Sequence, residues 1–218
     1  MNYLAHLFLS RESPEAMTGG LLGDFVKGAV GPQYSPAVRA GILLHRDIDR
    51  FTDAHPTVRA SRALVSPPRR RFAGILVDVF YDHFLARRWA EFCPTPLAEF
   101  TESVYGILWP QRANFPERLQ HILPHMRADD WLGSYAELWA VDAALNGIAR
   151  RFHRFPRAAA FAGGVQELER NYSELENQFR AFFPELQRHT ESRRTGAARL
   201  SHNPAPKEAA PQIALDEK

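Results

Sequence analysis

The sequence predicts an all-α protein, a single helical domain followed by a disordered C-terminal tail. Three observations lead to this prediction. Apolar residues recur at helical spacing along most of the chain, and no segment alternates apolar and polar residues with period two. Prolines fall mainly between the apolar segments. With 218 residues, 45% of them hydrophobic, the chain is long enough for one domain with a substantial core.

The expected helices are placed by their start and stop signals. Ser13 and Ser35 each precede a proline, which is typical of a helix start, and Gly28 and Gly31 follow the first of these segments. A proline pair opens the next long apolar segment, and Pro94 closes it. The predicted helices are residues 2–10, 13–27, 35–53, 68–92, 96–112, 115–125, 135–155 and 158–188.

The domain is expected to span residues 1–191, and residues 192–218 are expected to form the tail. The tail is rich in Ala, Pro and charge and has almost no large apolar residues. Such a segment cannot bury enough surface to offset its ordering entropy. The sequence also lacks an internal repeat and a Gly-rich phosphate loop, because Gly163-Gly164 is not followed by Lys-Ser/Thr.

Composition excludes several classes of protein. A net charge of only +2 argues against a nucleic-acid-binding protein. The one cysteine, Cys93, can form neither an intramolecular disulfide nor a multi-cysteine zinc site, which fits a reducing compartment. No stretch approaches the roughly 20 apolar residues that cross a bilayer. We therefore expect a soluble, cytoplasmic protein with no membrane partner.

The predicted helix at residues 35–53 carries ionisable residues on its apolar side. At helical spacing, Val38 and Ile42 are followed by His45, Asp49 and Thr52. A carboxylate or imidazole beside the core is costly unless a partner charge or a metal compensates it. The alternative is a simple His–Asp pair on a partly exposed face. The pattern alone leaves both open.

The predicted helix at residues 68–92 repeats the pattern. His83 falls within the continuation of its apolar stripe, and Asp82 lies one turn beyond Asp78. Two carboxylates at this spacing repel each other, and a divalent cation would remove the conflict. A paired arginine, such as Arg46 or Arg50, is the alternative account.

Two further ionisable residues lie in apolar surroundings. His6 is the single polar residue between Tyr3 and Leu9, where it is either a hydrogen-bonded core histidine or a ligand. Asp24 lies between two apolar pairs. Imidazole and carboxylate ligands together suit Mn, Fe, Zn or Ni rather than calcium. Such a site can activate water toward phosphate.

These residues lie in segments that resemble the acyl carrier protein phosphodiesterase family. The resemblance covers roughly residues 1–190 and is looser at LNGIARR (145–151) and from Tyr172 through FFP (182–184). The closest agreement is at MNYLAHL (1–7), GLLGDFVKG (20–28), GILLHRDID (41–49) with TD (52–53), and DVFYDHFL (78–85).

The resemblance implies an all-helical fold related to the HD-type phosphohydrolases and a manganese-dependent active site. It also implies hydrolysis of the phosphodiester that joins phosphopantetheine to a serine of holo-acyl carrier protein. HD enzymes carry an adjacent His-Asp pair, which this sequence lacks. Its nearest equivalents are His45 with Asp49 and the reversed pair Asp82-His83.

On this basis we assign roles to the seven ionisable residues. The residues expected to hold or support the metal are Asp24, His45, Asp78 and Asp82. The residues expected to orient ligands, position water or protonate the leaving serine oxygen are His6, Asp49 and His83.

Arginines form local clusters that are either solvated helix faces or a docking surface for an acidic partner. Arg69, Arg70 and Arg71 stand at the start of the predicted helix 68–92, where cations oppose the helix dipole. We expect them to bind the acidic carrier protein. Arg87-Arg88 and Arg150-Arg151 are the other candidate surfaces.

Two other functions fit the same residues. A phosphohydrolase on the same scaffold could act on a nucleotide such as guanosine polyphosphate. A non-catalytic module could instead bind acyl carrier protein, and its binding would be indifferent to a chelator.

Overall fold

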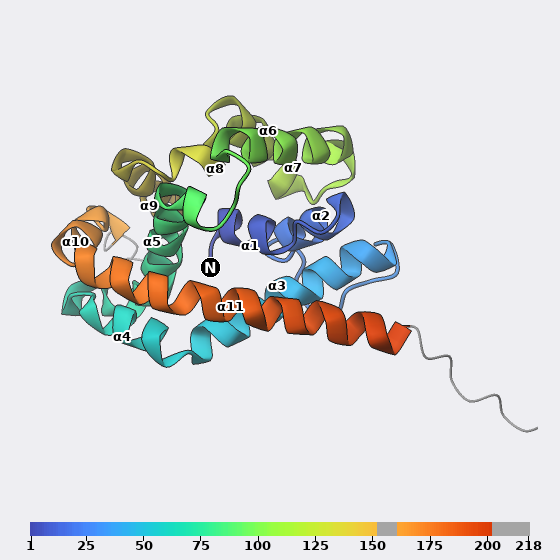
Figure 1. The fold of residues 1–218 in the computed structure, drawn as a ribbon. Helices are drawn as coiled ribbons and strands as arrows, with labels where there is room; N and C mark the ends of the chain where they lie inside the picture. Colours follow the sequence, from blue (N-terminus) through green and yellow to red (C-terminus); the bar gives the residue numbers. More distant parts are fainter. Residues whose placement is uncertain (152–160, 202–218) are drawn as a thin grey trace, which may run out of the picture.

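The computed structural model describes residues 1–151 and 161–201, and these residues form helices without a strand (Figure 1). The predicted all-α class is confirmed. The first half contains α1 (Tyr3–Leu9), α2 (Pro14–Leu22), α3 (Pro36–Ala54), α4 (Pro56–Leu64), the 3-10 helix η1 (Pro67–Phe72), α5 (Ala73–Arg87) and η2 (Trp89–Glu91). The second half contains α6 (Leu97–Leu108), η3 (Trp109–Asn114), α7 (Glu117–Ala128), α8 (Trp131–Ser134), α9 (Leu138–Arg151), α10 (Val165–Arg170) and α11 (Tyr172–Ser201).

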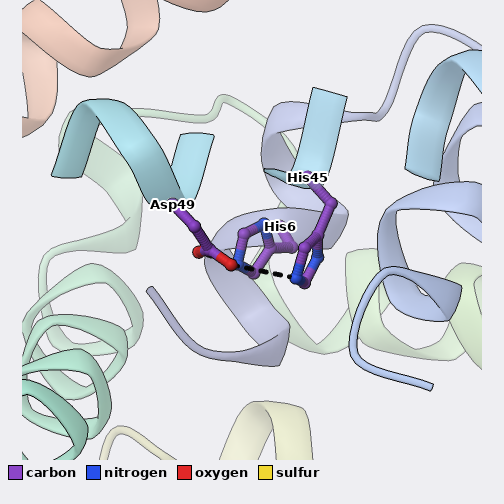
Figure 2. A group of neighbouring side chains, drawn as sticks. All are labelled: His6, His45 and Asp49. Atoms are coloured by element: carbon purple, nitrogen blue, oxygen red, sulfur yellow. Dashed lines mark ion pairs between the residues drawn. The ribbon is translucent and has the colours of Figure 1, made fainter. Parts of the chain in front are cut away.

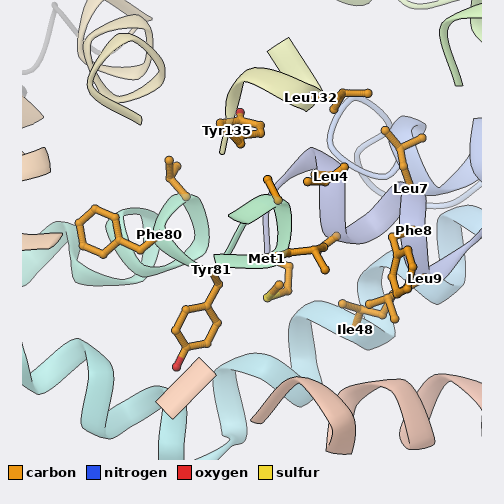
Figure 3. Close-up of a cluster of buried hydrophobic side chains, with 14 of the residues drawn as sticks. Met1, Leu4, Leu7, Phe8, Leu9, Ile48, Phe80, Tyr81, Leu132 and Tyr135 are labelled. Carbon is orange, nitrogen blue, oxygen red and sulfur yellow. The ribbon is translucent and has the colours of Figure 1, made fainter. Parts of the chain in front are cut away.

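Helices α1 and α5 form the centre of the molecule. Residues 4–9 of α1 and residues 79–86 of α5 are all buried. A helix that is apolar on all sides is a core helix, which fits this position. Their side chains belong to one buried cluster (Figure 3), which includes Leu4 and Phe8 of α1 and Phe80 and Tyr81 of α5. The ionisable residues of these two helices are therefore held by the core.

The longest helix, α11, packs along α3, α4 and α5 (Figure 1). Its aromatic side chains reach into the core. Phe183 contacts Phe8, and Phe182 contacts Tyr81, with ring centroids 5.9 and 5.7 Å apart. The helix thus covers aromatic side chains of α1 and α5.

Helices α2 and α3 approach each other backbone to backbone. A Cβ atom on Gly19 would overlap the carbonyl oxygen of Val38 and lie 2.8 Å from the Cα of Gly41. A Cβ on Gly41 would likewise meet the carbonyl of Ala16, at 2.5 Å. Only glycine permits this spacing, which brings the end of α2 against the side chains of α3.

Several helix boundaries differ from the expected ones. The caps at Ser13 and Ser35 are confirmed, since each side chain accepts a backbone N–H of its helix. Helix α2 was expected to reach residue 27 but ends at Leu22. The next residue, Gly23, packs directly against the imidazole of His45. The predicted helix 68–92 begins as the 3-10 helix η1, which opens with the proline pair, and α5 starts only at Ala73. Helix α4 was not predicted.

At the C-terminal end, α11 continues to Ser201, past the expected boundary at residue 191. Arg194 accounts for part of this extension, because its guanidinium donates to Glu12 and lies 3.5 Å from the carbonyl oxygen of Leu9. The rest of the predicted tail, residues 202–218, lies outside the described residues. So do residues 152–160, which include the end of the predicted helix 135–155 and the start of the predicted helix 158–188. Among the described helices, none has both the length and the apolar character needed to span a membrane.

Candidate metal centre

His45 and Asp49 lie one turn apart on α3 and face each other. The Nε2 atom of His45 is 3.2 Å from Oδ2 of Asp49. The other ring nitrogen, Nδ1, donates to the carbonyl oxygen of Gly20 at 2.7 Å. A carbonyl can only accept, so Nδ1 carries the proton, and a neutral ring turns the lone pair of Nε2 toward the carboxylate. This bond to the α2 backbone fixes the ring in the orientation of a metal-binding imidazole.

His6 reaches the same carboxylate from α1 (Figure 2). Its ring stacks on that of His45, with centroids 3.6 Å apart, and its Nε2 lies 3.1 Å from Oδ1 of Asp49. The contact does not have hydrogen-bond geometry, and neither ring nitrogen of this buried histidine has a hydrogen-bond partner. Burial lowers the pKa of His6 to about 4, although the contact with Asp49 opposes this shift. His6 therefore presents a neutral imidazole with an unused lone pair.

Asp49 completes the group and is its exposed member, with 43% of its side chain accessible. Burial of the carboxyl would raise its pKa, but its contacts with His45, His6 and the Met1 ammonium group hold the pKa well below its usual range. One atom from each of the three side chains lies within 4.8 Å of the others. Among the residues that the structure describes, this is the only such group of His, Cys, Asp or Glu side chains.

The three residues fit a metal ion. The Nε2 atoms of both histidines lie within 3.2 Å of the ionised carboxylate, and where they carry lone pairs these acceptors repel unless a positive charge lies among them. Protons on both rings would place two stacked imidazolium ions 3.6 Å apart, and burial keeps His6 neutral. A divalent cation satisfies all three atoms. Two histidines and one carboxylate also leave coordination positions open for water or substrate.

The α-ammonium group of Met1 joins Asp78 to this centre. It lies 2.9 Å from Oδ1 of Asp78 and 3.7 Å from Oδ1 of Asp49. Burial alone would lower the pKa of the amine, but the charges of Asp78 and Asp49 raise it to about 10. The amine is therefore charged at neutral pH. No side-chain pattern could have indicated this group.

Asp82 is used by the backbone of α1. Its carboxylate accepts the amide of Leu4 at 2.7 Å and those of Asn2 and Ala5 at 3.3 Å. Burial raises the pKa of Asp82 to about 7, against the opposing effects of the Met1 ammonium group and the three amides. The structure thus gives Asp82 a task in holding the start of α1, the helix that carries His6.

His83 and Asp24 lie outside the triad formed by His6, His45 and Asp49. The Nδ1 of His83 donates to the carbonyl of Tyr135 at 2.8 Å, and its Nε2 accepts the hydroxyl of Tyr172 at 2.9 Å. Both of its nitrogens are therefore occupied by the core, and burial lowers its pKa. Asp24 is partly exposed in the turn after α2, next to the glycine that packs on His45.

Comparison with known proteins places the chain in a family. The sequence model of the acyl carrier protein phosphodiesterase family matches residues 1–186. The chain belongs to that family. Curated acyl carrier protein phosphodiesterases of Serratia proteamaculans and Yersinia enterocolitica are 43% and 38% identical over 187 residues, which are 85% of this chain and 95% of each relative. One from Klebsiella pneumoniae is 35% identical over 194 residues, or 88% of this chain and 99% of the relative.

No solved structure matches the chain of this acyl carrier protein phosphodiesterase family member. Its relation to the HD-type phosphohydrolases therefore stays a prediction.

The three arginines expected to dock a partner of this phosphodiesterase do not share one environment. Arg69 donates to the buried Glu167 at 3.1 Å and to the carbonyl of Ala162 at 2.9 Å. Its guanidinium therefore has a structural role, because it connects η1 to Glu167 of α10 and to the loop before that helix. Arg70 and Arg71 are exposed and line an open groove of about 700 Å³ between η1, α4 and the start of α5.

Proposed function

We propose that this chain hydrolyses the phosphodiester joining phosphopantetheine to a serine of holo-acyl carrier protein, with a divalent metal ion bound by His6, His45 and Asp49. One observation carries the metal-dependent chemistry: the Nε2 atoms of two buried imidazoles converge on an ionised, partly exposed carboxylate. The relatives, named acyl carrier protein phosphodiesterase, indicate the substrate. The cytoplasm is the proposed location, consistent with a chain that has a single cysteine.

Manganese is the proposed ion, since imidazole and carboxylate ligands suit it and the family resemblance implies it. When bound, such an ion polarises a phosphoryl oxygen and lowers the pKa of a water molecule beside it. Other residues of the chain hold these three ligands in position. Gly20 orients His45, Asp82 anchors the helix that carries His6, and Asp49 opens the centre to solvent.

Two further groups act beside the metal ligands. The Met1 ammonium group supplies a fixed positive charge, which favours the anionic phosphodiester. Asp78 pairs with that ammonium and is 29% exposed, so we assign it the proton of the attacking water. Asp24 is kept as a candidate supporting ligand, because its turn packs on His45.

The test measures metal binding and catalysis separately. The parent protein with Mn²⁺ should convert holo-carrier to apo-carrier, as read by mass spectrometry, and EDTA should stop the reaction. His6→Gln, His45→Gln and Asp49→Asn should each reduce the rate at least about 100-fold. Titration calorimetry should show that each variant also loses Mn²⁺ affinity. His121→Gln is the matched control, because His121 is exposed on α7 and, among the described residues, bonds only to the Glu117 carbonyl of its own helix.

Normal Mn²⁺ binding by the triad variants would rule out this metal site. Unchanged carrier mass after incubation with several divalent metals would rule out the activity. Turnover of a guanosine polyphosphate instead would favour the nucleotide phosphohydrolase. Chelator-independent carrier binding without turnover would favour the non-catalytic module.

A further inference from the structure

The groove beside the metal centre is lined by four arginines from two elements. Arg59 and Arg62 come from α4, and Arg70 and Arg71 come from η1. Asp53 and Asp78 are the carboxylates in its lining. Because α4 was not predicted as a helix, nothing in the sequence pattern indicated that its arginines would lie beside those of η1.

Most of this positive charge is not neutralised by the protein. Arg62 pairs with Asp53 at 2.5 Å, and Asp78 pairs with the Met1 ammonium group. Arg59 and Arg70 each donate to a backbone carbonyl, which leaves their charges uncompensated. Arg59, Arg70 and Arg71 make no ion pair with any residue in the described ranges. Like charges gathered in one hollow repel each other, so the groove favours an anionic ligand.

The groove also adjoins the metal centre. Asp78 lines it and contacts the Met1 ammonium group, which lies 3.7 Å from Asp49. A ligand that fills the groove would therefore lie next to the metal centre, where the phosphodiester is expected to bind. Arg69, one of the three arginines expected to dock the partner, is excluded from this surface by its pair with Glu167.

We propose that Arg59, Arg70 and Arg71 bind the acidic protein surface that flanks the modified serine of the carrier. This inference rests on the proposed function, which requires a phosphodiester on a folded protein to reach the metal centre. The carrier is too large to enter the metal centre, so it must contact the protein surface next to that centre. The adjoining groove has the charge that complements carboxylates, and guanidinium groups bind carboxylates in two-bond geometry.

The experiment compares two double charge reversals of equal net charge. Arg59→Glu with Arg71→Glu alters the groove. Arg39→Glu with Arg188→Glu is the control, since both residues are exposed and make no ion pair with the described residues. Arg39 lies roughly 20 Å from Asp53 along α3, at 1.5 Å per residue. Circular dichroism and Mn²⁺ titration verify that each variant folds and keeps its metal centre.

Apo-carrier, which lacks the prosthetic group, is the binding probe, so the result does not depend on turnover. The groove variant should bind it at least about tenfold more weakly at low salt, and the difference should shrink as salt rises. With holo-carrier, the loss should appear as a raised KM. The control should bind like the parent.

Equal binding by the groove variant and the control would overturn the inference. So would unchanged apo-carrier binding with lost affinity for free 4'-phosphopantetheine, which would assign the groove to the prosthetic group. If the parent binds apo-carrier through the groove but hydrolyses nothing, the docking surface stands and the proposed function fails.

Discussion

At the scale of single residues, Asp82 shows how one helix can cap another. The first turn of α1 contains no acidic residue, and the side chain of its N-cap residue Asn2 makes no capping bond. The carboxylate of Asp82, supplied by α5, accepts three amides there instead. An anion at a helix N-terminus is favoured by the helix dipole as well as by these bonds.

We therefore expect Asp82→Ala to destabilise the fold. Loss of the carboxylate leaves buried amides without an acceptor, which should lower the free energy of unfolding by about 3 kcal/mol. Urea unfolding followed by circular dichroism in EDTA measures this change without a contribution from metal binding. Asp129→Ala, at an exposed residue after α7, is the control and should stay within about 0.5 kcal/mol. Lost Mn²⁺ affinity at unchanged stability would instead make Asp82 the metal ligand expected from the sequence.

Residue-scale patterns predicted part of the site. The spacing of His45 and Asp49 placed them on one face, and the isolation of His6 in an apolar run marked it as unusual. The same signal marked His83, whose partners are Tyr135 and Tyr172. An ionisable residue in an apolar stripe needs a partner, but the pattern does not say whether that partner is a metal or a polar group of the core.

At the scale of elements, α3 links the metal centre to the outer helix α11. His45 and Asp49 face α1, whereas Asp47 accepts from His189 of α11 at 2.6 Å and Phe51 stacks on the same ring. Burial would raise the pKa of Asp47, but the bond from His189 and the charge of Arg193 lower it. Displacement of α3 would therefore disturb both the metal centre and the contacts with α11.

The glycine contact between α2 and α3 provides a test. In Gly19→Ala the new methyl group would overlap backbone atoms of α3, which cannot rotate away as a side chain can. The helices should separate, and Gly20 should move from His45. We expect at least about 2 kcal/mol lower stability, together with weaker Mn²⁺ binding. Both are measurable by denaturation and titration calorimetry.

Gly106→Ala is the matched control for this prediction. Gly106 is exposed within α6, and a Cβ there meets nothing within 4 Å. The substitution should stabilise the protein by about 0.5–1 kcal/mol, because alanine loses less backbone entropy in a helix. Similar effects of the two substitutions would show that the close contact does not constrain the centre.

At the scale of the whole molecule, the Met1 ammonium group connects α3 and α5, because it contacts Asp49 of the first and Asp78 of the second. We expect a short peptide added before Met1 to reduce activity on holo-carrier at least about tenfold. The added peptide bond turns the buried cation into a neutral amide, so that the partly exposed carboxylates of Asp78 and Asp49 lose their counter-charge. The same peptide added after Lys218 is the control. Equal rates for the two extended proteins would show that the ammonium group has no part in the site.

The fold class was predictable from the sequence because helical periodicity is a local property. What could not be predicted is which helices meet. His6 reaches Asp49 only because α1 crosses α3, and Arg69 is held by Glu167, a residue almost a hundred positions away. The extent of α11 was underestimated because the composition after residue 191 is polar, whereas Arg194 is fixed by contacts with the first turns of the chain.

The position of α11 also has a consequence for synthesis on the ribosome. The helices that hold the metal centre are complete once Arg87 is made, but the helix that covers their aromatic side chains ends only at Ser201. At ~5–20 residues per second, that interval lasts roughly 5 to 25 s. During it, Phe8, Tyr81 and Phe84 lack their partners on α11. We therefore expect the nascent chain to expose an apolar aromatic surface during this interval, which is the kind of surface that ribosome-associated chaperones bind.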